Sequence, residues 1–253
     1  MAGSLTVIGL GPGPPEWVTP EAAAALAAAT DIIGYGPYVA RLALRAGQRA
    51  HASDNRVELE RARHALRLAQ DGERVAVVSG GDPGVFAMAA AVFEAMEHGA
   101  PDWRSLAVRV LPGISAMQAA AARAGAPLGH DFCAISLSDN LKNWEAIARR
   151  LRAAAEGDFV IALYNPASRA RPQTIHDAFA VLRSAKAGVT PVILAQSVGR
   201  ENERVIITTL QDADLTQVDM RTLVIIGSSE TRLVQRAQGA PFVYTPRSYG
   251  AGR

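Results

Sequence analysis

Short apolar runs alternate along this chain with alanine-rich amphipathic stretches, and this alternation limits the fold more than any other feature of the sequence. Several runs are apolar at every position, which is typical of parallel strands covered on both faces. The predicted strands are residues 5–9, 31–35, 74–79, 107–111, 132–137, 159–164, 192–196 and 223–227. The predicted helices are residues 20–29, 57–70, 86–98, 114–124, 144–154 and 173–184. The order predicts an α/β fold with a largely parallel sheet.

Two local signals add detail to this fold. Thr19 followed by Pro20 predicts a helix start, with a capping hydroxyl and a proline in the first turn. The strand-like segment at residues 204–209 follows the run at 192–196 after only a polar turn. We therefore expect these two segments to pair antiparallel, which makes the sheet of the second half mixed.

The turn-rich segment at residues 125–129 is the expected linker between two α/β domains, residues 1–128 and 129–253. The start of the chain lacks the features of a signal peptide, and no apolar run approaches the ~20 residues of a membrane helix. The single cysteine, Cys133, excludes an internal disulfide and a cysteine-cluster metal site. The net charge is only +2. These observations favour a cytoplasmic protein with no membrane or nucleic-acid partner.

Glycine-rich turns follow three of the predicted strands. The first is Gly9-Leu10-Gly11-Pro12-Gly13, which lacks the third glycine of a dinucleotide-binding loop because Pro14 stands in its place. Its prolines also offer no N–H groups to a pyrophosphate, which argues against a nicotinamide dehydrogenase. A plain tight turn explains this segment about as well as a ligand loop does.

The second turn is Ser79-Gly80-Gly81-Asp82-Pro83, and the third is Pro112-Gly113-Ile114-Ser115-Ala116. Paired glycines let a ligand lie against the backbone, and the Asp82 carboxylate can accept hydrogen bonds from an amino group or a ribose. The structural alternatives are that Asp82 caps a helix opening at Pro83, and that Ser115 caps the following helix.

The order of these three turns resembles the tetrapyrrole methylase family, whose members use S-adenosylmethionine, and the resemblance covers essentially the whole chain. It implies two α/β domains that enclose the cofactor in a cleft, and a homodimer. The turns of the first half would line the cofactor site with Pro12, Gly80, Asp82, Val85, Ser115 and Ala116. The second half would add Tyr164, Ala195, Thr222 and Leu223.

Segments of the second half resemble the branch of this family that methylates C17 of precorrin-3B and contracts the ring to precorrin-4 in cobalamin biosynthesis. These segments are Ile135-Ser136-Leu137-Ser138-Asp139, Leu163-Tyr164-Asn165-Pro166 with Ser168 and Arg171, Gly199-Arg200-Glu201, Asp219-Met220 with Thr222, and Tyr244-Thr245-Pro246-Arg247-Ser248-Tyr249. The chain departs from the branch at Gly227-Ser228-Ser229, where Gly-Asn-Ser is expected, at residues 140–143 and at Ser248. The substrate contacts are therefore the least defined part of the resemblance.

Ring contraction needs a proton removed from a hydroxyl at C20 and acid assistance to a departing lactone oxygen. The candidates for these roles are Asp139, Ser138 and Asn165, because they follow predicted strands toward the expected cleft. Asp139 is equally placed to cap the helix before Trp144. The carboxylates of a tetrapyrrole suit the planar fork of arginine. The candidate carboxylate-binding residues are Lys142, Arg169, Arg171, Arg200 and Arg247.

Other functions stay open at this point. Shared cofactor motifs do not separate this reaction from methylation of the cobalt-containing substrate or of another precorrin position, and a non-catalytic corrinoid or S-adenosylmethionine binding protein is a further alternative. No metal site is expected, because the five histidines lack ligand-like spacing, and only His130 at the domain junction is kept in reserve. Cys133 is predicted to be a buried, unreactive thiol.

Overall fold

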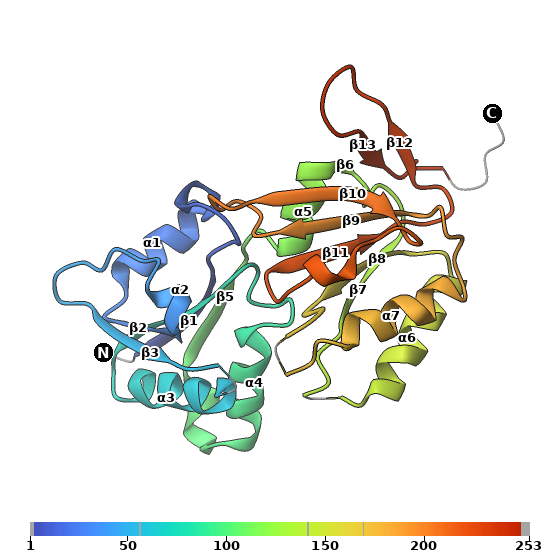
Figure 1. Cartoon of the computed structure of the whole chain (residues 1–253). Coiled ribbons are helices and arrows are strands. Elements are labelled where there is room, and N and C mark those ends of the chain that lie inside the picture. Colours follow the sequence, from blue (N-terminus) through green and yellow to red (C-terminus); the bar gives the residue numbers. More distant parts are fainter. Residues whose placement is uncertain (1–2, 56, 141, 169, 249–253) are drawn as a thin grey trace. The chain divides into compact units, whose positions relative to one another are not determined.

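The chain forms two compact units, Met1–Ala116 and Met117–Arg253 (Figure 1). A computed structural model describes residues 3–55, 57–140, 142–168 and 170–248. The change of unit lies at the start of helix α5 (Ala116–Ala124), after its first residue, whereas the boundary expected from the sequence is residue 128, beyond this helix. The reason is that α5 is bound to the second half, since the N–H of Met117 donates to the Tyr164 hydroxyl at 3.1 Å.

Unit 1 contains a five-stranded parallel sheet in the order β3-β2-β4-β1-β5. Its strands are β1 (Ser4–Gly9), β2 (Asp31–Tyr35), β3 (Arg49–Ser53), β4 (Arg74–Ser79) and β5 (Ala107–Leu111). Its helices are α1 (Pro20–Ala28), α2 (Gly36–Val39), α3 (Glu58–Gln70) and α4 (Met88–His98), with the 3-10 helices η1 (Pro15–Trp17) and η2 (Pro101–Ser105). The predicted cap of α1 is confirmed, because the Thr19 hydroxyl accepts the N–H of Ala22 at 3.2 Å.

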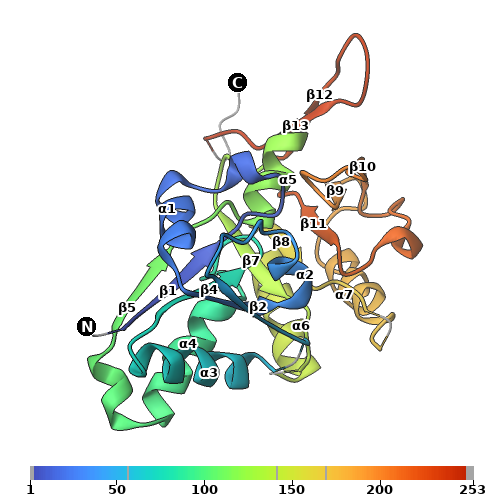
Figure 2. The ribbon, with the colours of Figure 1, turned by 90° about the vertical axis from the view of Figure 1, so that its left-hand side faces the viewer.

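Alternate residues of the central strands in unit 1 face two helical layers. Leu5 and Val7 of β1 pack with α3 and α4, whereas Ile8 packs with α1 on the opposite face. Figure 2 shows α3 and α4 along one side of this sheet and α1 along the other. Because both faces are covered, the central strands are predominantly apolar, as the sequence predicted. The edge strand β3 is largely exposed, and its sequence, Arg-Ala-His-Ala-Ser, contains no apolar run that would have predicted it.

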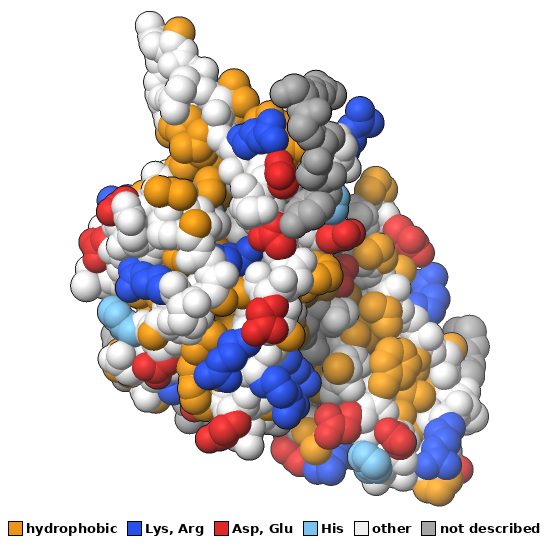
Figure 3. Space-filling model, turned by 90° about the vertical axis from the view of Figure 1, so that its right-hand side faces the viewer, with side chains coloured by type: hydrophobic (Ala, Val, Ile, Leu, Met, Phe, Trp, Pro, Cys, Tyr) orange, Lys and Arg blue, Asp and Glu red, His pale blue; other side chains and the backbone are white. Residues whose placement is uncertain are grey.

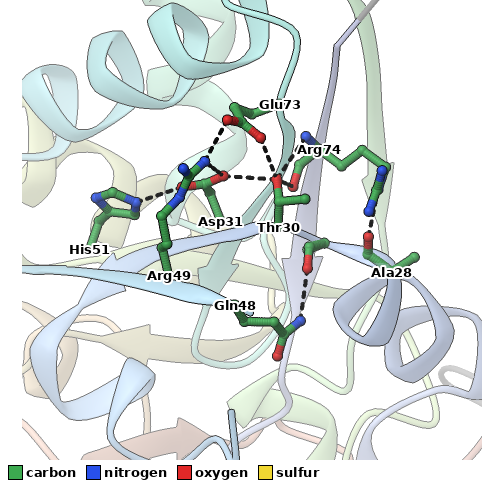
Figure 4. A network of polar contacts seen from close by, with 9 residues as sticks. Ala28, Thr30, Asp31, Gln48, Arg49, His51, Glu73 and Arg74 are labelled. Carbon is green, nitrogen blue, oxygen red and sulfur yellow. Dashed lines mark hydrogen bonds and ion pairs between the residues drawn. The ribbon is translucent and has the colours of Figure 1, made fainter. Parts of the chain in front are cut away.

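A polar network joins the amino ends of β2, β3 and β4 (Figure 4). Its centre is Asp31, whose fully buried carboxylate accepts two hydrogen bonds from Arg49 at 2.8 and 2.7 Å. His51 lies 2.8 Å from the same carboxylate, Thr30 donates to it at 2.8 Å, and Arg49 also pairs with Glu73 at 2.6 Å. Burial acts to raise the pKa of Asp31, but the hydrogen bonds from Arg49, His51 and Thr30 outweigh it and lower this pKa to about 2.

Unit 2 contains a mixed five-stranded sheet in the order β10-β9-β11-β8-β7. Its strands are β7 (Phe132–Ser136), β8 (Val160–Tyr164), β9 (Pro191–Gln196), β10 (Arg204–Thr209) and β11 (Thr222–Ile226). The predicted antiparallel pair of β9 and β10 is confirmed, while β7 and β8 pair parallel and β11 runs antiparallel to β8 and β9. Helices α6 (Trp144–Glu156) and α7 (Thr174–Arg183) bury one face of this sheet around Leu151, Phe179 and Leu194.

A small sheet ties the end of unit 2 to its beginning. It contains β12 (Arg232–Val234), β13 (Phe242–Tyr244) and β6 (Gly125–Ala126), and β13 runs parallel to β6. The buried Thr245 hydroxyl donates to the Pro127 carbonyl at 2.6 Å and lies 2.8 Å from the Thr231 hydroxyl. Residues 125–129, the expected linker, are thus held inside unit 2 by these contacts. The sequence did not predict these strands because each is only two or three residues long, as is the 3-10 helix η3 (Leu215–Gln217).

Neither sign of charge dominates the face of the molecule that Figure 3 shows. Figure 3 shows acidic and basic side chains interspersed on one face of the molecule, which agrees with the net charge of +2. Across the described ranges, none of the helices has both the length and the apolar composition needed to cross a membrane.

Candidate functional site

The carboxyl ends of β1, β4 and β5 bring the three glycine-rich turns of unit 1 together at one edge of the parallel sheet. The N–H of Gly11 donates to the Gly81 carbonyl at 3.1 Å. A Cβ added to Gly113 would lie 2.5 Å from that carbonyl oxygen, and one added to Gly9 would lie 2.7 Å from the Gly113 nitrogen. These distances leave no room for a side chain, so the turns can cross only with glycine at these positions.

Asp82 connects two of these turns. Its Oδ1 accepts the N–H of Gly84 at 2.8 Å, and its Oδ2 accepts the N–H of Gly113 at 3.0 Å. The alternative that Asp82 caps a helix at Pro83 is wrong, because α4 begins only at Met88. A carboxylate can accept about four hydrogen bonds, so Asp82 can hold the turns and also accept from a ligand.

The other predicted cofactor residues of unit 1 lie in the same turns. Pro12 and Val85 are half-buried, and the N–H of Val85 donates to the Asp82 carbonyl at 3.3 Å. Ser115 is buried and directly precedes Ala116, the first residue of α5. The structure therefore brings the predicted cofactor residues of the first half to one sheet edge.

Tyr38 and Arg41 support these turns. Neither residue is among those predicted from the sequence. Tyr38 of α2 lies against Gly80, where an added Cβ would be 2.7 Å from the tyrosine ring. The Arg41 guanidinium donates to the carbonyls of Gly11 at 3.2 Å and of Gly13 at 2.6 Å. No sequence pattern marks either residue, because both follow β2 and meet the turns only in the folded chain.

In unit 2, the carboxyl ends of β7, β8 and β9 and the amino end of β11 lie at one edge of the sheet, since β11 runs antiparallel to β8 and β9. This edge carries the remaining predicted cofactor residues. Tyr164 ends β8, and Thr222 begins β11. Ala195 of β9 and Leu223 of β11 are register partners on neighbouring strands, and both are buried.

Ser136, Ser138 and Asn165 form a hydrogen-bonded cluster at this edge. The side-chain amide of Asn165 donates to the Ser136 hydroxyl oxygen at 2.9 Å, and the N–H of Ser138 donates to the same oxygen at 3.3 Å. Asn165 has a φ of 53°, a left-handed conformation that asparagine adopts more readily than most residues. Ser138 and Asn165 are among the residues predicted from the sequence, whereas the buried Ser136, which joins them, is not.

Asp139 lies beside Arg171 at this same edge, with 3.3 Å between Oδ1 and Nε. The Arg171 Nε has no hydrogen-bonded partner, so this contact is an ion pair without a directed hydrogen bond. Arg171 also donates to the Leu137 carbonyl at 3.3 Å, and its side chain is 13% exposed, whereas that of Asp139 is 46% exposed. The alternative that Asp139 caps α6 is wrong, because the Asn143 side chain accepts the N–H of Ala146 at 3.1 Å and caps it instead.

The remaining candidate carboxylate-binding residues differ in their surroundings. Lys142 is half-buried, and burial together with the charge of Arg150 lowers its pKa from the ordinary value. Arg200 and Arg247 are exposed. Arg169 lies outside the described residues.

The two residues kept apart from the cofactor motifs have ordinary surroundings. Cys133 is half-buried at the start of β7, and burial raises the pKa of its thiol. His130 lies 3.7 Å from the carboxylate of Asp131. In the part of the chain that the structure describes, no three His, Cys, Asp or Glu side chains gather as a metal site would require.

Comparisons with known proteins place these geometries in a family. Residues 4–214 match the family of tetrapyrrole (corrin/porphyrin) methylases. The chain is 57% identical over 249 residues to the precorrin-3B C(17)-methyltransferase of Sinorhizobium sp, covering 98% of each. It is 43% identical over 246 residues to the probable cobalt-factor III C(17)-methyltransferase of Salmonella typhimurium, covering 97% of this chain and 99% of that protein. The crystal structure of the methyltransferase CobJ matches with a TM-score of 0.91 and 53% identity, covering 96% of this chain and all of that one. The chain therefore belongs to the tetrapyrrole methylase family.

Proposed function

We propose that this chain is an S-adenosylmethionine-dependent methyltransferase that methylates C17 of precorrin-3B and contracts the ring to precorrin-4 in cobalamin biosynthesis. The main support is the likeness to the Sinorhizobium relative over nearly the whole length of both chains. The cluster of Ser136, Ser138 and Asn165 adds support together with Asp139 at the same sheet edge, because these residues include the polar groups that ring contraction requires. The proposal includes a cytoplasmic location. It also includes a homodimer, and sedimentation of the purified protein tests this oligomeric state.

The residues of this chain suit the proposed cofactor. S-adenosylmethionine, when bound, supplies an activated methyl group on a sulfonium. The crossing glycine turns of unit 1 leave backbone groups without covering side chains, and the Asp82 carboxylate suits the amino group of the cofactor. The residues proposed to hold the cofactor are Pro12, Gly80, Asp82, Val85, Ser115, Ala116, Tyr164, Ala195, Thr222 and Leu223.

The polar cluster of unit 2 is proposed to carry the proton chemistry of contraction. The exposed Asp139 carboxylate accepts the proton of the C20 hydroxyl, and Arg171 holds that carboxylate in place. The Ser138 hydroxyl and the second N–H of the Asn165 amide donate hydrogen bonds to the lactone oxygen, which leaves as a carboxylate. Lys142, Arg200 and Arg247 bind carboxylates of the substrate. Fixing the accepting carbon in line with the methyl group contributes up to ~7–11 kcal/mol in favourable cases.

The test is an anaerobic incubation of the purified protein with methyl-labelled S-adenosylmethionine and precorrin-3B, followed by mass and absorbance together. The expected result is label at C17 and the spectrum of a contracted ring. The control replaces the cofactor with S-adenosylhomocysteine, which has no methyl group to give. Cofactor binding without methyl transfer to precorrin-3B would contradict the proposed substrate.

The cobalt-containing form of the substrate is the second candidate. It is favoured by the likeness to the Salmonella relative, which is named for cobalt-factor III. The same incubation with each substrate form at equal concentration separates the two, since the natural substrate is expected to have the higher kcat/KM. A protein that binds the cofactor or a corrinoid and methylates neither form would be a binding protein instead.

A further inference from the structure

In the described part of unit 1, a guanidinium group is buried without a carboxylate partner. Arg61 projects from α3 and is 5% exposed. Its Nε donates to the Ser53 hydroxyl at 2.8 Å, and its terminal nitrogens lie 2.6 Å from the Asp54 carbonyl and 3.3 Å from the Met88 sulfur. Among the residues that the structure describes, no Asp or Glu forms an ion pair with Arg61. A buried charge is normally paired, so this arrangement calls for an explanation.

Arg61 lines a groove of about 360 Å³ between β3 and α3, which we call the α3 groove. Its other lining residues are Ile33, His51, Ala52, Ser53, Val57, Glu60, His64 and Arg67. The rings of His51 and His64 meet edge to face, with their centroids 4.9 Å apart. Arg67 adds a second permanent positive charge, so the groove suits a negatively charged ligand.

One carboxylate lines the α3 groove, and it is already paired. Glu60 lies 2.5 Å from Arg63, one turn further along the exposed side of α3. Burial lowers the pKa of Arg61 from its ordinary value, and the negative charge of Glu58 only partly opposes this effect. The charge of Arg61 is therefore incompletely balanced within unit 1.

The Arg61 end of the α3 groove lies at the sheet edge that carries the glycine turns. Ser53 ends β3, and Met88 begins α4, the helix that follows the second turn. Tyr38, whose ring packs against Gly80, is close enough to act electrostatically on Arg61. A ligand that lies over the carboxyl edge of this sheet would thus come under the influence of this charge.

We propose that the Arg61 end of the α3 groove is an anion subsite, which takes a carboxylate side chain of the tetrapyrrole substrate. This inference rests on the proposed function. The carboxylate supplies the negative partner that Arg61 lacks. A guanidinium has five N–H groups, so Arg61 can keep its three contacts to Ser53, Asp54 and Met88 and still donate to the ligand.

The test compares Arg61→Met with the matched control Arg63→Met. Both remove one positive charge from α3, but Arg63 lies outside the groove lining and pairs with Glu60 on the surface. The probe is uroporphyrin III, a tetrapyrrole with carboxylates on every pyrrole ring, whose binding is followed by fluorescence quenching without turnover. Arg61→Met is expected to weaken probe binding about 10- to 100-fold, and Arg63→Met less than about twofold. Calorimetry with S-adenosylhomocysteine should give the wild-type affinity for both variants.

Equal probe affinity of the wild type and Arg61→Met would overturn the subsite, as would an equal loss in both variants. If Arg61→Met does not fold, amide hydrogen exchange of the wild type tests the subsite instead. The probe should slow exchange at residues 53–61, and inorganic phosphate at equal concentration should not. Protection by phosphate alone would mean that the groove binds small anions, which also overturns the proposal. Failure of the proposed function looks different, because the wild type would then bind the probe through Arg61 yet not methylate precorrin-3B.

Discussion

At the scale of single residues, the Ser136 hydroxyl orients the polar cluster of unit 2. Its oxygen accepts hydrogen bonds from both Asn165 and Ser138. Replacing it by alanine leaves these donors without their acceptor, which costs about 1–3 kcal/mol for a buried group. We expect Ser136→Ala to slow ring contraction about tenfold in single-turnover absorbance measurements, with unchanged affinity for S-adenosylmethionine. Ser136→Thr keeps a hydroxyl and should restore most of the rate, and a contraction rate unaffected by Ser136→Ala would refute this positioning role.

Asp139 is the residue for which the proposed proton transfer makes the sharpest prediction. The variant Asp139→Asn keeps the shape of the side chain but cannot accept a proton in the same way, so contraction should slow about 100-fold. Cofactor affinity, measured by calorimetry, should stay within about twofold of the wild type. The control is Asp131→Asn, an exposed carboxylate of the same unit. Equal losses of contraction and of cofactor binding would show that Asp139 has no specific part in the proton transfer.

A residue of the proposed site could be predicted from the sequence only where its contacts lie close to it along the chain. Asp82 and Asp139 stood out because they follow predicted strands, but their alternative roles as helix caps depended on where α4 and α6 begin. Those boundaries are decided by packing, which the local sequence does not contain. Arg41 and Ser136 bind residues that lie about 30 positions away, so no local pattern identifies them.

At the scale of elements, the Asp31 network fastens β2, β3 and β4 at their amino ends. The pKa of Asp31 is about 2 in the folded chain, below its ordinary value of 3.8. The charged carboxylate therefore adds stability that is fully present above about pH 4 and is lost as the pH falls through about 2. The pKa difference corresponds to about 2 kcal/mol.

Asp31→Asn should lower the free energy of unfolding by about 3 kcal/mol at pH 7, because it leaves Arg49 without its buried partner. Urea unfolding at pH 7, 4 and 3 measures this loss. The difference in free energy of unfolding between the wild type and the variant should become smaller as the pH falls. Asp102→Asn, at an exposed position in η2, serves as the control and should leave the unfolding curves unchanged. A gap that does not change with pH would mean that the charge of Asp31 adds no stability.

The strands with the most buried apolar surface were the ones that the sequence predicted best. The covered strands β4, β8 and β11 contain uninterrupted apolar runs, and the apolar run of β1 is broken only by Thr6; the sequence predicted each strand to within a residue or two. The edge strand β3 and the short strands β6, β12 and β13 bury little apolar surface, so their sequences lack the pattern that marks a strand.

At the scale of the whole molecule, Thr245 closes unit 2 by joining the end of the chain to the segment at residues 125–129. Its hydroxyl is buried between Pro127 and Thr231. Thr245→Val keeps the shape but leaves the Pro127 carbonyl without this donor, which should cost about 1–3 kcal/mol. A lower melting temperature in calorimetry is the expected result, with Ser248→Ala, at an exposed position nearby, as the control. Equal melting temperatures for Thr245→Val and the wild type would contradict this closing role.

The sequence made the family recognisable because its signals are local turns in a fixed order, and these turns need glycine where they cross one another. The second half was less informative about the site. There the edge that carries the proposed site residues is assembled from four strand ends, and supporting contacts such as the pair of Asp139 and Arg171 arise only when β7 and β8 lie side by side. The boundary between the units depends likewise on the tertiary contacts of α5.

The strands of unit 1 separate the Asp31 network from the glycine-rich turns. The Asp31 network lies where β2 begins, and the glycine-rich turns proposed to hold the cofactor follow the opposite ends of β1, β4 and β5, roughly 15 Å away along strands of five residues. Mutations at one end therefore leave the anchoring contacts at the other end in place. Natural or directed evolution can therefore change the sequences of these turns while the contacts that stabilise the sheet stay the same.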